Sequence, residues 1–363
     1  MKNTFGNNLS ITICGESHGE ALVAILDGIK PGVKVDIEYI SSRLSLRRPS
    51  GSVSTQRVEM DEFSILSGVF EGKTTGTPIT ILIPNTSKKS ADYEDIKHLL
   101  RPSHADYAAF LKYGGNQDYR GGGHFSGRVT AALVAAGAIA LSALREMGIK
   151  IGTHIKSIGN VNDIAFNDLE SDIDRLCNMS FPVLSDKAGA DMRYEIEKAK
   201  NDLDSIGGQL ETAVIGMPGG YGEPYFDSVE GMLSHILFSV PGVKGVSFGI
   251  GEKFATLRGS QANDAFEISD GKVVTVTNNN GGINGGITNG MPIIFTCTVK
   301  PTPSIAREQH TVDIKKLEET AISVHGRHDP CIVHRAASVV NACTAIALLD
   351  LIYTRNGNAP EGV

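Results

Sequence analysis

Apolar residues alternate with polar or small residues in several short segments of this chain, and a period of two predicts β-strands. Each segment is bounded by Gly, Pro, Asn or Ser, which favour turns. Strand follows strand more often than strand alternates with helix. The predicted strands are 9–14, 21–26, 63–70, 79–83, 149–158, 210–217, 244–249, 273–277 and 292–299.

Longer apolar stretches predict helices. Residues 128–147 are rich in Ala and Leu, and residues 330–353 form a second long apolar stretch. A shorter helix is expected at 37–46, where Asp36 can cap the first turn. A charged surface helix is expected at 192–203.

This order of elements favours an α+β fold with antiparallel sheets over a doubly wound parallel sheet. The chain has no short-period repeat and no low-complexity linker. Its polar clusters lie near both ends and in the middle, so one site needs the whole chain. We therefore expect a single domain, 1–363, in which the loop-rich segment 84–127 is functional.

Composition excludes several functions. The chain has 363 residues, 41% of them apolar and 21% charged, as in soluble globular proteins. A net charge of −7 and the absence of a basic stripe argue against nucleic-acid binding. There is no N-terminal signal core and no uninterrupted apolar run of about 18 residues, so no membrane span is expected. Five cysteines without a CxxC pair indicate free thiols in the cytoplasm.

Three segments combine His, Arg and Gly, and they carry the candidate chemistry. They are 15–19 (Gly-Glu-Ser-His-Gly), 101–107 running on to 119–123, and 326–331 (Gly-Arg-His-Asp-Pro-Cys). Arginine binds carboxylate or phosphate, histidine moves protons near neutral pH, and glycine permits tight turns. Because the protein is acidic overall, it must gather its cations locally to bind an anion. The pattern predicts an enzyme that acts on a strongly anionic small molecule.

The 15–19 segment also matches the G-x-S-x-G elbow of serine hydrolases, with Ser17 as the nucleophile. That elbow needs a helix after the serine and an earlier strand for the oxyanion hole. Residues 21–28 read as strand and turn, and only fourteen residues precede the motif. A tight turn that presents His18 is the better interpretation.

The Gly-rich segment 119–128 runs into a predicted helix, whose N-terminus suits a phosphate or carboxylate. It matches neither a Walker A loop nor G-x-G-x-x-G. A third hypothesis is a non-catalytic flavin or nucleotide carrier that uses such glycine loops without acid–base groups. The histidines at 325, 328 and 334 match no zinc motif, and no metal is predicted.

Taken together, these segments closely resemble the chorismate synthase family, from Thr4-Phe5-Gly6 to the last predicted helix. The resemblance implies conversion of 5-enolpyruvylshikimate 3-phosphate to chorismate and phosphate by a 1,4-anti elimination that needs reduced FMN. It also implies a homotetramer and a β-α-β sandwich with helices between antiparallel sheets.

The resemblance assigns roles to three residues. His18 matches the histidine that protonates the departing phosphate. His104 matches the histidine that interacts with the reduced flavin. Asp329 matches the carboxylate that assists removal of the C6 hydrogen.

Other positions match the binding regions of the family. Those for substrate are Arg47, Arg101, Arg128 and Arg327. Those for FMN are Arg47, His124, Phe125, Ser126, Pro241, Gly242, Gly285, Lys300, Pro301, Thr302, Pro303, Ser304 and Arg327.

The chain departs from the usual family pattern in three places. His124 stands where an arginine is common, so the cation there becomes titratable. Residues 52–54 (Ser-Val-Ser) lack the arginine of many members, which weakens the case for NADPH at that loop. Pro241-Gly242 replace a polar-small pair, so a flavin contact there must come from the backbone.

Overall fold

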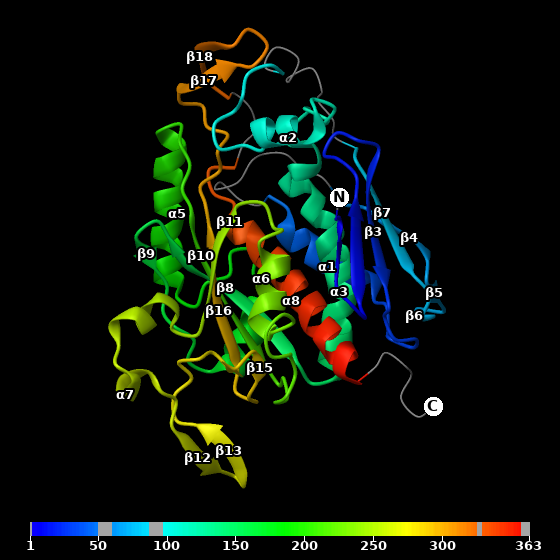
Figure 1. The fold of residues 1–363 in the computed structure, drawn as a ribbon, viewed down its shortest axis with the longest axis vertical. Coiled ribbons are helices and arrows are strands. Elements are labelled where there is room, and N and C mark those ends of the chain that lie inside the picture. Colours follow the sequence, from blue (N-terminus) through cyan, green and yellow to red (C-terminus); the bar gives the residue numbers. More distant parts are fainter. Residues whose placement is uncertain (1, 50–59, 87–96, 325–328, 357–363) are drawn as a thin grey trace.

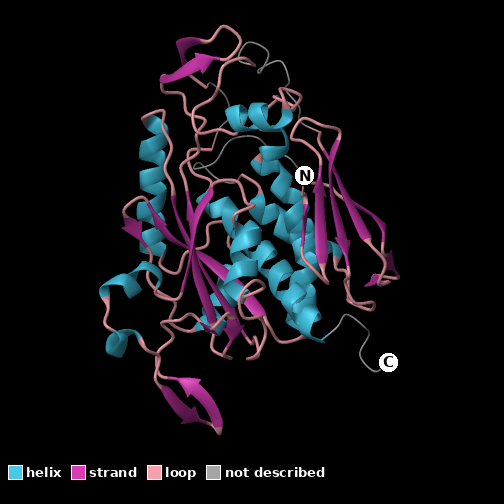
Figure 2. Ribbon diagram, viewed as in Figure 1, coloured by secondary structure: helices cyan, strands magenta, loops and turns pink. Residues whose placement is uncertain are grey.

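Two antiparallel sheets enclose a layer of helices in the computed structural model, which describes residues 2–49, 60–86, 97–324 and 329–356 (Figure 1). Figure 2 shows the same three layers by secondary structure, with the helices between the sheets. This confirms the α+β prediction and the sandwich order that the resemblance implied.

The first sheet has the strand order β1-β2-β3-β7-β4. Its central strand β3 pairs antiparallel with β2 and β7. Leu22, Ala24 and Leu26 alternate toward the helices and are fully buried, as a half-buried sheet requires. The strands are β1 (Thr4–Phe5), β2 (Ser10–Cys14), β3 (Ala21–Asp27), β7 (Ile79–Pro84) and β4 (Ser64–Ser67).

The second sheet has the order β11-β16-β10-β8-β9. Thr153 of β8 and Thr212 of β10 face the helical layer, where the Thr153 hydroxyl donates to Asn341 Oδ1 at 2.6 Å. The strands are β8 (Lys150–Ile158), β9 (Val161–Asn162), β10 (Gly208–Ile215), β11 (Val243–Phe248) and β16 (Ile293–Val299).

The helical layer is built on α3 (Thr130–Glu146) and α8 (Val333–Asn356), which pack against each other. Helices α1 (Ile37–Arg47) and α6 (Val229–Leu237) complete the layer. Two segments, Gly127–Glu146 and Val333–Asn356, are long and apolar enough to cross a membrane. Polar residues such as Ser142 and Asn341 interrupt them, in agreement with the expectation that no apolar run of about 18 residues is uninterrupted. In both, 89% of the apolar window is buried inside the molecule, as in core helices.

Smaller elements surround the sandwich. Helices α4 and α5 cover the outer face of the second sheet, α2 lies near one end of the helical layer, and the β12–β13 hairpin projects from the opposite end (Figure 1). These elements are α2 (Asp106–Tyr113), α4 (Leu169–Leu176), α5 (Asp186–Asn201), α7 (Gly259–Ala262), three 3-10 helices (Gly123–Phe125, Gly127–Val129, Gly251–Thr256), and the hairpins β5–β6 (Val69–Phe70, Lys73–Thr74), β12–β13 (Phe266–Ser269, Lys272–Thr275), β14–β15 (Ile283–Asn284, Ile287–Thr288) and β17–β18 (Gln309–Asp313, Glu318–Ile322).

Most predicted elements are confirmed, and the differences have local causes. Asp36 caps α1 as expected, because its carboxylate accepts from Tyr39 N at 2.9 Å. Helix α5 begins six residues before the predicted 192, because Ser185 caps it by accepting from Ala188 N. The predicted strand 63–70 is split at Gly68, which has a φ of +79°. Two 3-10 turns precede α3, so regular helix begins at Thr130.

Candidate active site

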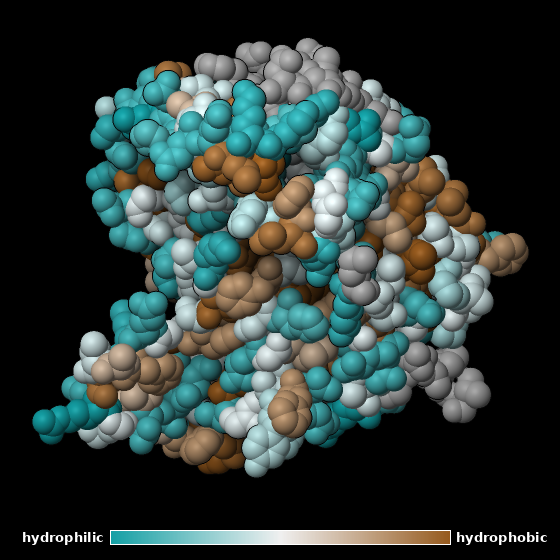
Figure 3. Space-filling model, turned by 45° about the horizontal axis from the view of Figure 1, so that its top comes forward, coloured by the Kyte–Doolittle hydropathy of each residue, from teal (hydrophilic) through white to brown (hydrophobic). Residues whose placement is uncertain are grey.

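A cavity of about 1010 Å³ lies at one end of the helical layer. The N-terminal ends of α3 and α8, the C-terminal ends of α1 and α6, and residues of β1, β2 and β11 contribute to its wall. Both core helices thus turn their N-termini, the positive ends of their dipoles, toward this space. Figure 3 shows a hollow on the face turned to the viewer, with apolar side chains inside a polar rim.

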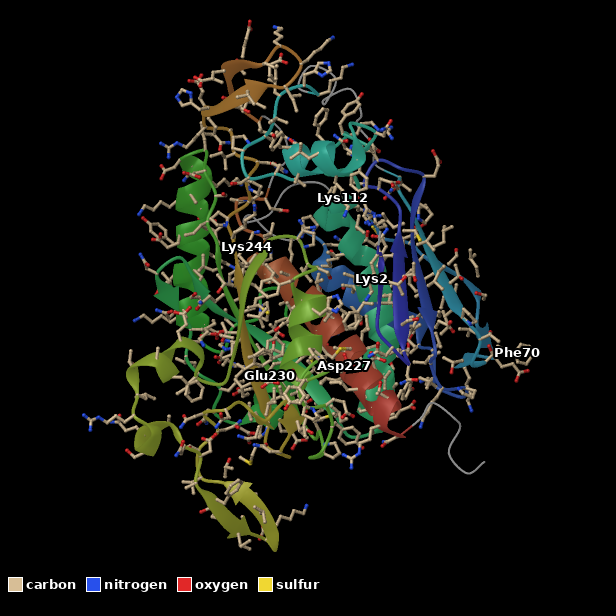
Figure 4. All side chains as sticks on the ribbon, viewed as in Figure 1. Lys2, Phe70, Lys112, Asp227, Glu230 and Lys244 are labelled. Atoms are coloured by element: carbon tan, nitrogen blue, oxygen red, sulfur yellow. The ribbon has the colours of Figure 1, made fainter. Side chains whose placement is uncertain are left out.

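The cavity wall is cationic although the chain is acidic. Among the described residues, nine Lys or Arg side chains line it, against three Asp. Lys2 and Lys244, labelled in Figure 4, belong to this set. The cations are therefore gathered locally, as the net charge of −7 led us to expect.

The 15–19 segment forms the turn between β2 and β3 and places His18, which is 5% exposed, in the cavity wall. The Ser17 hydroxyl donates to the Arg120 carbonyl at 3.3 Å and lies 3.0 Å from His18 Nδ1. A hydroxyl has one proton, so when Ser17 donates to the carbonyl, Nδ1 is the donor in the second contact. In that tautomer Nε2 is the atom that exchanges a proton.

Asn85 holds the same turn in place. Its amide donates to the carbonyls of Glu16 at 2.9 Å and Gly19 at 3.1 Å. Gly121 lies against the turn, where an added Cβ would stand 2.7 Å from His18 Cε1. Glycine is therefore required there for the close approach of the two loops.

The serine-hydrolase interpretation is wrong. After the turn the chain enters β3 and not a helix, so the elbow geometry is missing. Ser17 is 2% exposed, and its proton is used on a backbone carbonyl.

His104 joins two predicted segments across the cavity. Its Nε2 lies 2.7 Å from the Ser304 hydroxyl. In the same region, Lys300 Nζ donates to the Ser103 carbonyl at 2.7 Å, and Ser103 has a φ of +58°. The loop that follows 101 is thereby tied to 300–304, which the sequence had suggested separately.

The Gly-rich loop enters α3 through capped turns. Ser126 caps the turn before α3 by accepting from Arg128 N at 3.2 Å. His124 Nδ1 donates to the Gly15 carbonyl at 2.7 Å, which ties this loop to the His18 turn. Phe125 is 40% exposed and also lines the cavity.

A buried cluster of arginines is linked to the His18 turn through Asn85, whose Oδ1 accepts from Arg128 Nε at 3.1 Å. Arg47 and Arg128 both donate to Asp61, Arg47 at 2.9 Å from Nη2 to Oδ2. Burial opposes ionisation of Asp61, but the two guanidinium groups outweigh it and hold the pKa of this carboxyl below its usual value. Arg335 contacts Asp329 and donates to the Arg47 carbonyl at 2.8 Å.

The guanidinium of Arg101 forms hydrogen bonds with other groups of the protein. Its guanidinium donates to both oxygens of Asp106, at 2.8 Å and 2.7 Å, and to the Gly121 carbonyl at 2.7 Å. Although it lines the cavity, these contacts also make it an anchor for the loop that carries His104.

Most of the predicted site residues meet in this cavity. Gly285 does not line it, because it forms the turn of the β14–β15 hairpin near the start of α6. Arg327 lies outside the described residues. The predicted residues that line the cavity are His18, Arg47, Arg101, His104, His124, Phe125, Ser126, Arg128, Pro241, Gly242, Lys300, Pro301, Thr302, Pro303, Ser304 and Asp329.

The sequence analysis missed Asp61, Asn85, Gln117 and Arg335. Arg335 stands six residues after Asp329, and that spacing does not put two side chains on one helix face, so no helical pattern pairs them. Asp61 and Asn85 lie in short polar segments beside strands, 59–62 and 85–90, and no motif marks either residue.

Four buried polar atoms of the cavity wall lack a hydrogen-bond partner within the described residues. They are Arg47 Nε, Arg48 Nε, Gln117 Oε1 and Thr302 Oγ1. Buried polar groups are normally paired, so these atoms fit a polar ligand. No group of three or more His, Cys, Asp or Glu side chains suited to a metal occurs in the described ranges.

A cationic cavity with the buried His18 in its wall, set in a layered α+β fold, defines an enzyme that performs acid–base chemistry on an anionic small molecule. The family model described as chorismate synthase matches residues 9–353. The chain belongs to the chorismate synthase family. It is a lyase of the shikimate pathway.

Similar proteins support this assignment over nearly the full chain. The chain is 46% identical to a chorismate synthase of Pyrococcus abyssi over 96% of its length and 97% of that protein. It is 43% identical to one of Thermococcus gammatolerans, with 99% of both chains covered. A crystal structure of chorismate synthase superposes with a TM-score of 0.77 at 30% identity, covering 97% of this chain and 94% of that one.

Proposed function

We propose that this enzyme converts 5-enolpyruvylshikimate 3-phosphate to chorismate and phosphate by a 1,4-anti elimination that requires reduced FMN. The observation that carries the proposal is the buried His18, whose Nδ1 contacts Ser17, in a cavity lined by nine cationic side chains of the described residues. The substrate has two carboxylates and a phosphate, and FMN adds a second phosphate. Several arginines are needed to offset that charge.

The cavity residues fit a flavin mononucleotide beside the substrate. The volume of the cavity, about 1010 Å³, is at the upper end of the range for small-molecule sites, roughly 300–1000 Å³. Residues 124–126, 241–242 and 300–304 line it, and Thr302 Oγ1 needs a partner. Reduced FMN, when bound, supplies electron density that no amino-acid side chain can provide.

The protein's own residues supply the binding and the acid–base steps. The C3–O bond breaks and phosphate leaves, and His18 Nε2 donates a proton to it. Arg47 and Arg128 hold the anionic groups, and their buried position strengthens those contacts. A hydrogen also leaves C6, so substrate and product have the same oxidation state.

Asp329 and His104 act on the side of the reaction where the C6 proton leaves the substrate. Asp329 is 9% exposed and is held by Arg335 at the cavity wall, where its carboxylate can take or relay the proton from C6. His104, which contacts Ser304, holds a proton beside the segment proposed for the flavin.

We further propose a cytoplasmic homotetramer. All five cysteines are free, which suits a reducing compartment. The projecting β12–β13 hairpin exposes Phe266 and Ile268, which are 73% and 71% accessible and would be better buried against another subunit. NADPH use stays a prediction, since the loop that would bind it lies outside the described residues.

An anaerobic assay of phosphate release from the shikimate ester with chemically reduced FMN tests the function. Chorismate and phosphate should form together, and a fluorophosphonate probe should leave Ser17 unlabelled. FMN binding without phosphate release would instead support a flavin carrier.

A further inference from the structure

Asp61 is a buried carboxylate that stands behind the cavity wall. Its side chain is fully buried, and it is not among the lining residues, whereas Arg47 and Arg128 are. We propose that Asp61 is a positioning residue that fixes the spacing and orientation of these two guanidinium groups for the anionic substrate. The identity of that substrate rests on the proposed function, but the anion site does not.

The carboxylate gives one oxygen to each arginine. Oδ2 accepts from Arg47 Nη2 at 2.9 Å, and Oδ1 accepts from Arg128 Nη1. Arg48 Nε lies 3.8 Å from Oδ2 at the edge of the same group. Because Arg47 ends α1 and Arg128 precedes α3, one side chain couples two elements of the helical layer.

The two arginines depend on Asp61 to different degrees. Arg128 also donates from Nε to Asn85 Oδ1 at 3.1 Å and from Nη2 to the Pro84 carbonyl at 3.4 Å. Arg47 Nε is buried without a partner in the described part of the chain. Loss of Asp61 should therefore displace Arg47 more than Arg128.

Like charges explain why a carboxylate is needed at this point. Burial lowers the pKa of Arg47, Asp61 raises it, and the neighbouring Arg335 and Arg128 lower it further. Without Asp61 the guanidinium groups repel each other across a poorly solvated space, so their spacing is no longer defined.

The backbone at Asp61 makes a clean substitution available. Asp61 has a φ of +50°, in the left-handed region that Asp and Asn tolerate better than most residues. Asp61→Asn therefore keeps the shape and the backbone and removes the charge. Asp61→Glu keeps the charge and moves it by one methylene.

A role in charge balance alone predicts the opposite result from a role in positioning. Removing a negative charge beside the cavity makes the site more cationic, so electrostatics alone would tighten the binding of a small anion. Positioning predicts weaker binding, because the arginines no longer converge. The direction of the change separates the two roles.

The experiment is calorimetric titration of the purified full-length protein with inorganic phosphate. Asp61→Asn should weaken phosphate binding by roughly tenfold or more, the scale of losing about one hydrogen bond between a guanidinium and the anion. Asp61→Glu should also weaken it, although its charge is unchanged. Equal or tighter binding by Asp61→Asn, unchanged binding by Asp61→Glu, or no phosphate binding by the wild type would overturn the proposal.

Asp350→Asn is the matched control. Asp350 is equally buried, but it accepts from the backbone of Asn7, Asn8 and Leu9, and it does not line the cavity. It should lower the melting temperature and leave phosphate binding unchanged. A parallel loss of phosphate affinity in this control would reduce the Asp61 effect to general destabilisation and contradict positioning.

Turnover provides a separate readout. If the wild type releases phosphate from the shikimate ester, Asp61→Asn should raise KM more than it lowers kcat, because the arginines bind the ester before and during reaction. A fall in kcat at constant KM would contradict this. A wild type that binds phosphate but does not turn over the ester would defeat the proposed function and leave the Asp61 inference standing.

Discussion

At the scale of single residues, function depends on how a side chain is held as much as on its type. His18 is an example, because Ser17 orients its ring and Asn85 fixes the turn that carries it. With Nδ1 donating to Ser17, Nε2 is the proton-exchanging atom. We propose Ser17 as a positioning residue and His18 as the acid.

Replacement of these two neighbours should separate their roles. His18→Ala should reduce turnover by roughly 10²–10⁴-fold, the usual range for a lost general acid. Ser17→Ala should reduce turnover less than His18→Ala does, because the imidazole remains in the cavity wall and loses only the contact that orients it. Steady-state phosphate release measures both, with circular dichroism to confirm folding. Full activity in His18→Ala, or a covalent Ser17 adduct during turnover, would contradict these roles.

The residue types of the site could be predicted, but their partners could not. His18, His104 and Asp329 lie in dense polar motifs with Gly or Pro nearby, so they stand out in the sequence. Asp61 contacts arginines 14 and 67 positions away, and no local pattern encodes such pairs. Gly285 was suggested by resemblance and lies in a hairpin outside the cavity wall.

At the scale of elements, the close packing of α3 and α8 shapes the cavity, since the N-terminal ends of both helices form part of its wall. Their approach requires Gly137, where an added Cβ would lie 2.4 Å from Ala342 Cβ. Gly137→Ala gains up to about 1 kcal/mol of helix propensity but overpacks the contact at a cost of about 1–3 kcal/mol.

We therefore expect Gly137→Ala to lower the free energy of unfolding, measured by denaturant titration. Ala342→Gly should restore only a small part of the loss when the two changes are combined, because the Ala342 Cα and carbonyl oxygen still lie 2.7 Å and 2.9 Å from the added Cβ. A stabilised single variant would show that the helices do not meet as described.

The outer face of the second sheet holds a buried ionic cluster. His154 of β8 lies 3.0 Å from Asp163 and 3.3 Å from Glu211 of β10, which also pairs with Lys156 at 2.6 Å. Burial disfavours the charged imidazole, but the two carboxylates outweigh it and raise the pKa of His154 above 6.5. Burial also raises the pKa of Glu211, but His154 and Lys156 outweigh it and lower the value from 4.5 to about 2.

These shifts predict that the free energy of unfolding falls both toward acid pH, the acid limb, and toward alkaline pH, the alkaline limb. The contribution of His154 is complete below its unfolded pKa of 6.5 and is lost as pH rises through the higher folded value. That of Glu211 is complete above 4.5 and is lost as pH falls toward about 2. His154→Gln should flatten the alkaline limb in unfolding titrations from about pH 5 to about pH 9. An unchanged slope above 6.5 in this variant would contradict a charged His154.

Periodicity located most of the regular elements, because a strand or long helix with one buried face records that burial in its sequence. The short helices α2, α4 and α6 were not predicted, since eight or nine residues give too few turns for a clear period. The order of the layers came from the resemblance, because it depends on contacts between segments far apart, such as α3 with α8.

At the scale of the whole molecule, the charge distribution defines where the substrate binds. The chain carries −7 overall, yet nine cationic side chains from the described ranges line one cavity. Loops from the first sheet, the Gly-rich segment and the start of α8 must all be in place for that cavity to form. Catalysis should therefore require the intact sandwich, and it should require a reduced flavin that is not consumed.

The most direct test of the account is a count of electrons during turnover. Under anaerobic conditions, FMN reduced once should support many rounds of reaction, with equal amounts of chorismate and phosphate formed and the flavin still reduced at the end. Oxygen should stop the reaction, and fresh dithionite should restart it. Steady product formation with oxidised FMN, or consumption of reductant in proportion to chorismate, would contradict a redox-neutral elimination at this site.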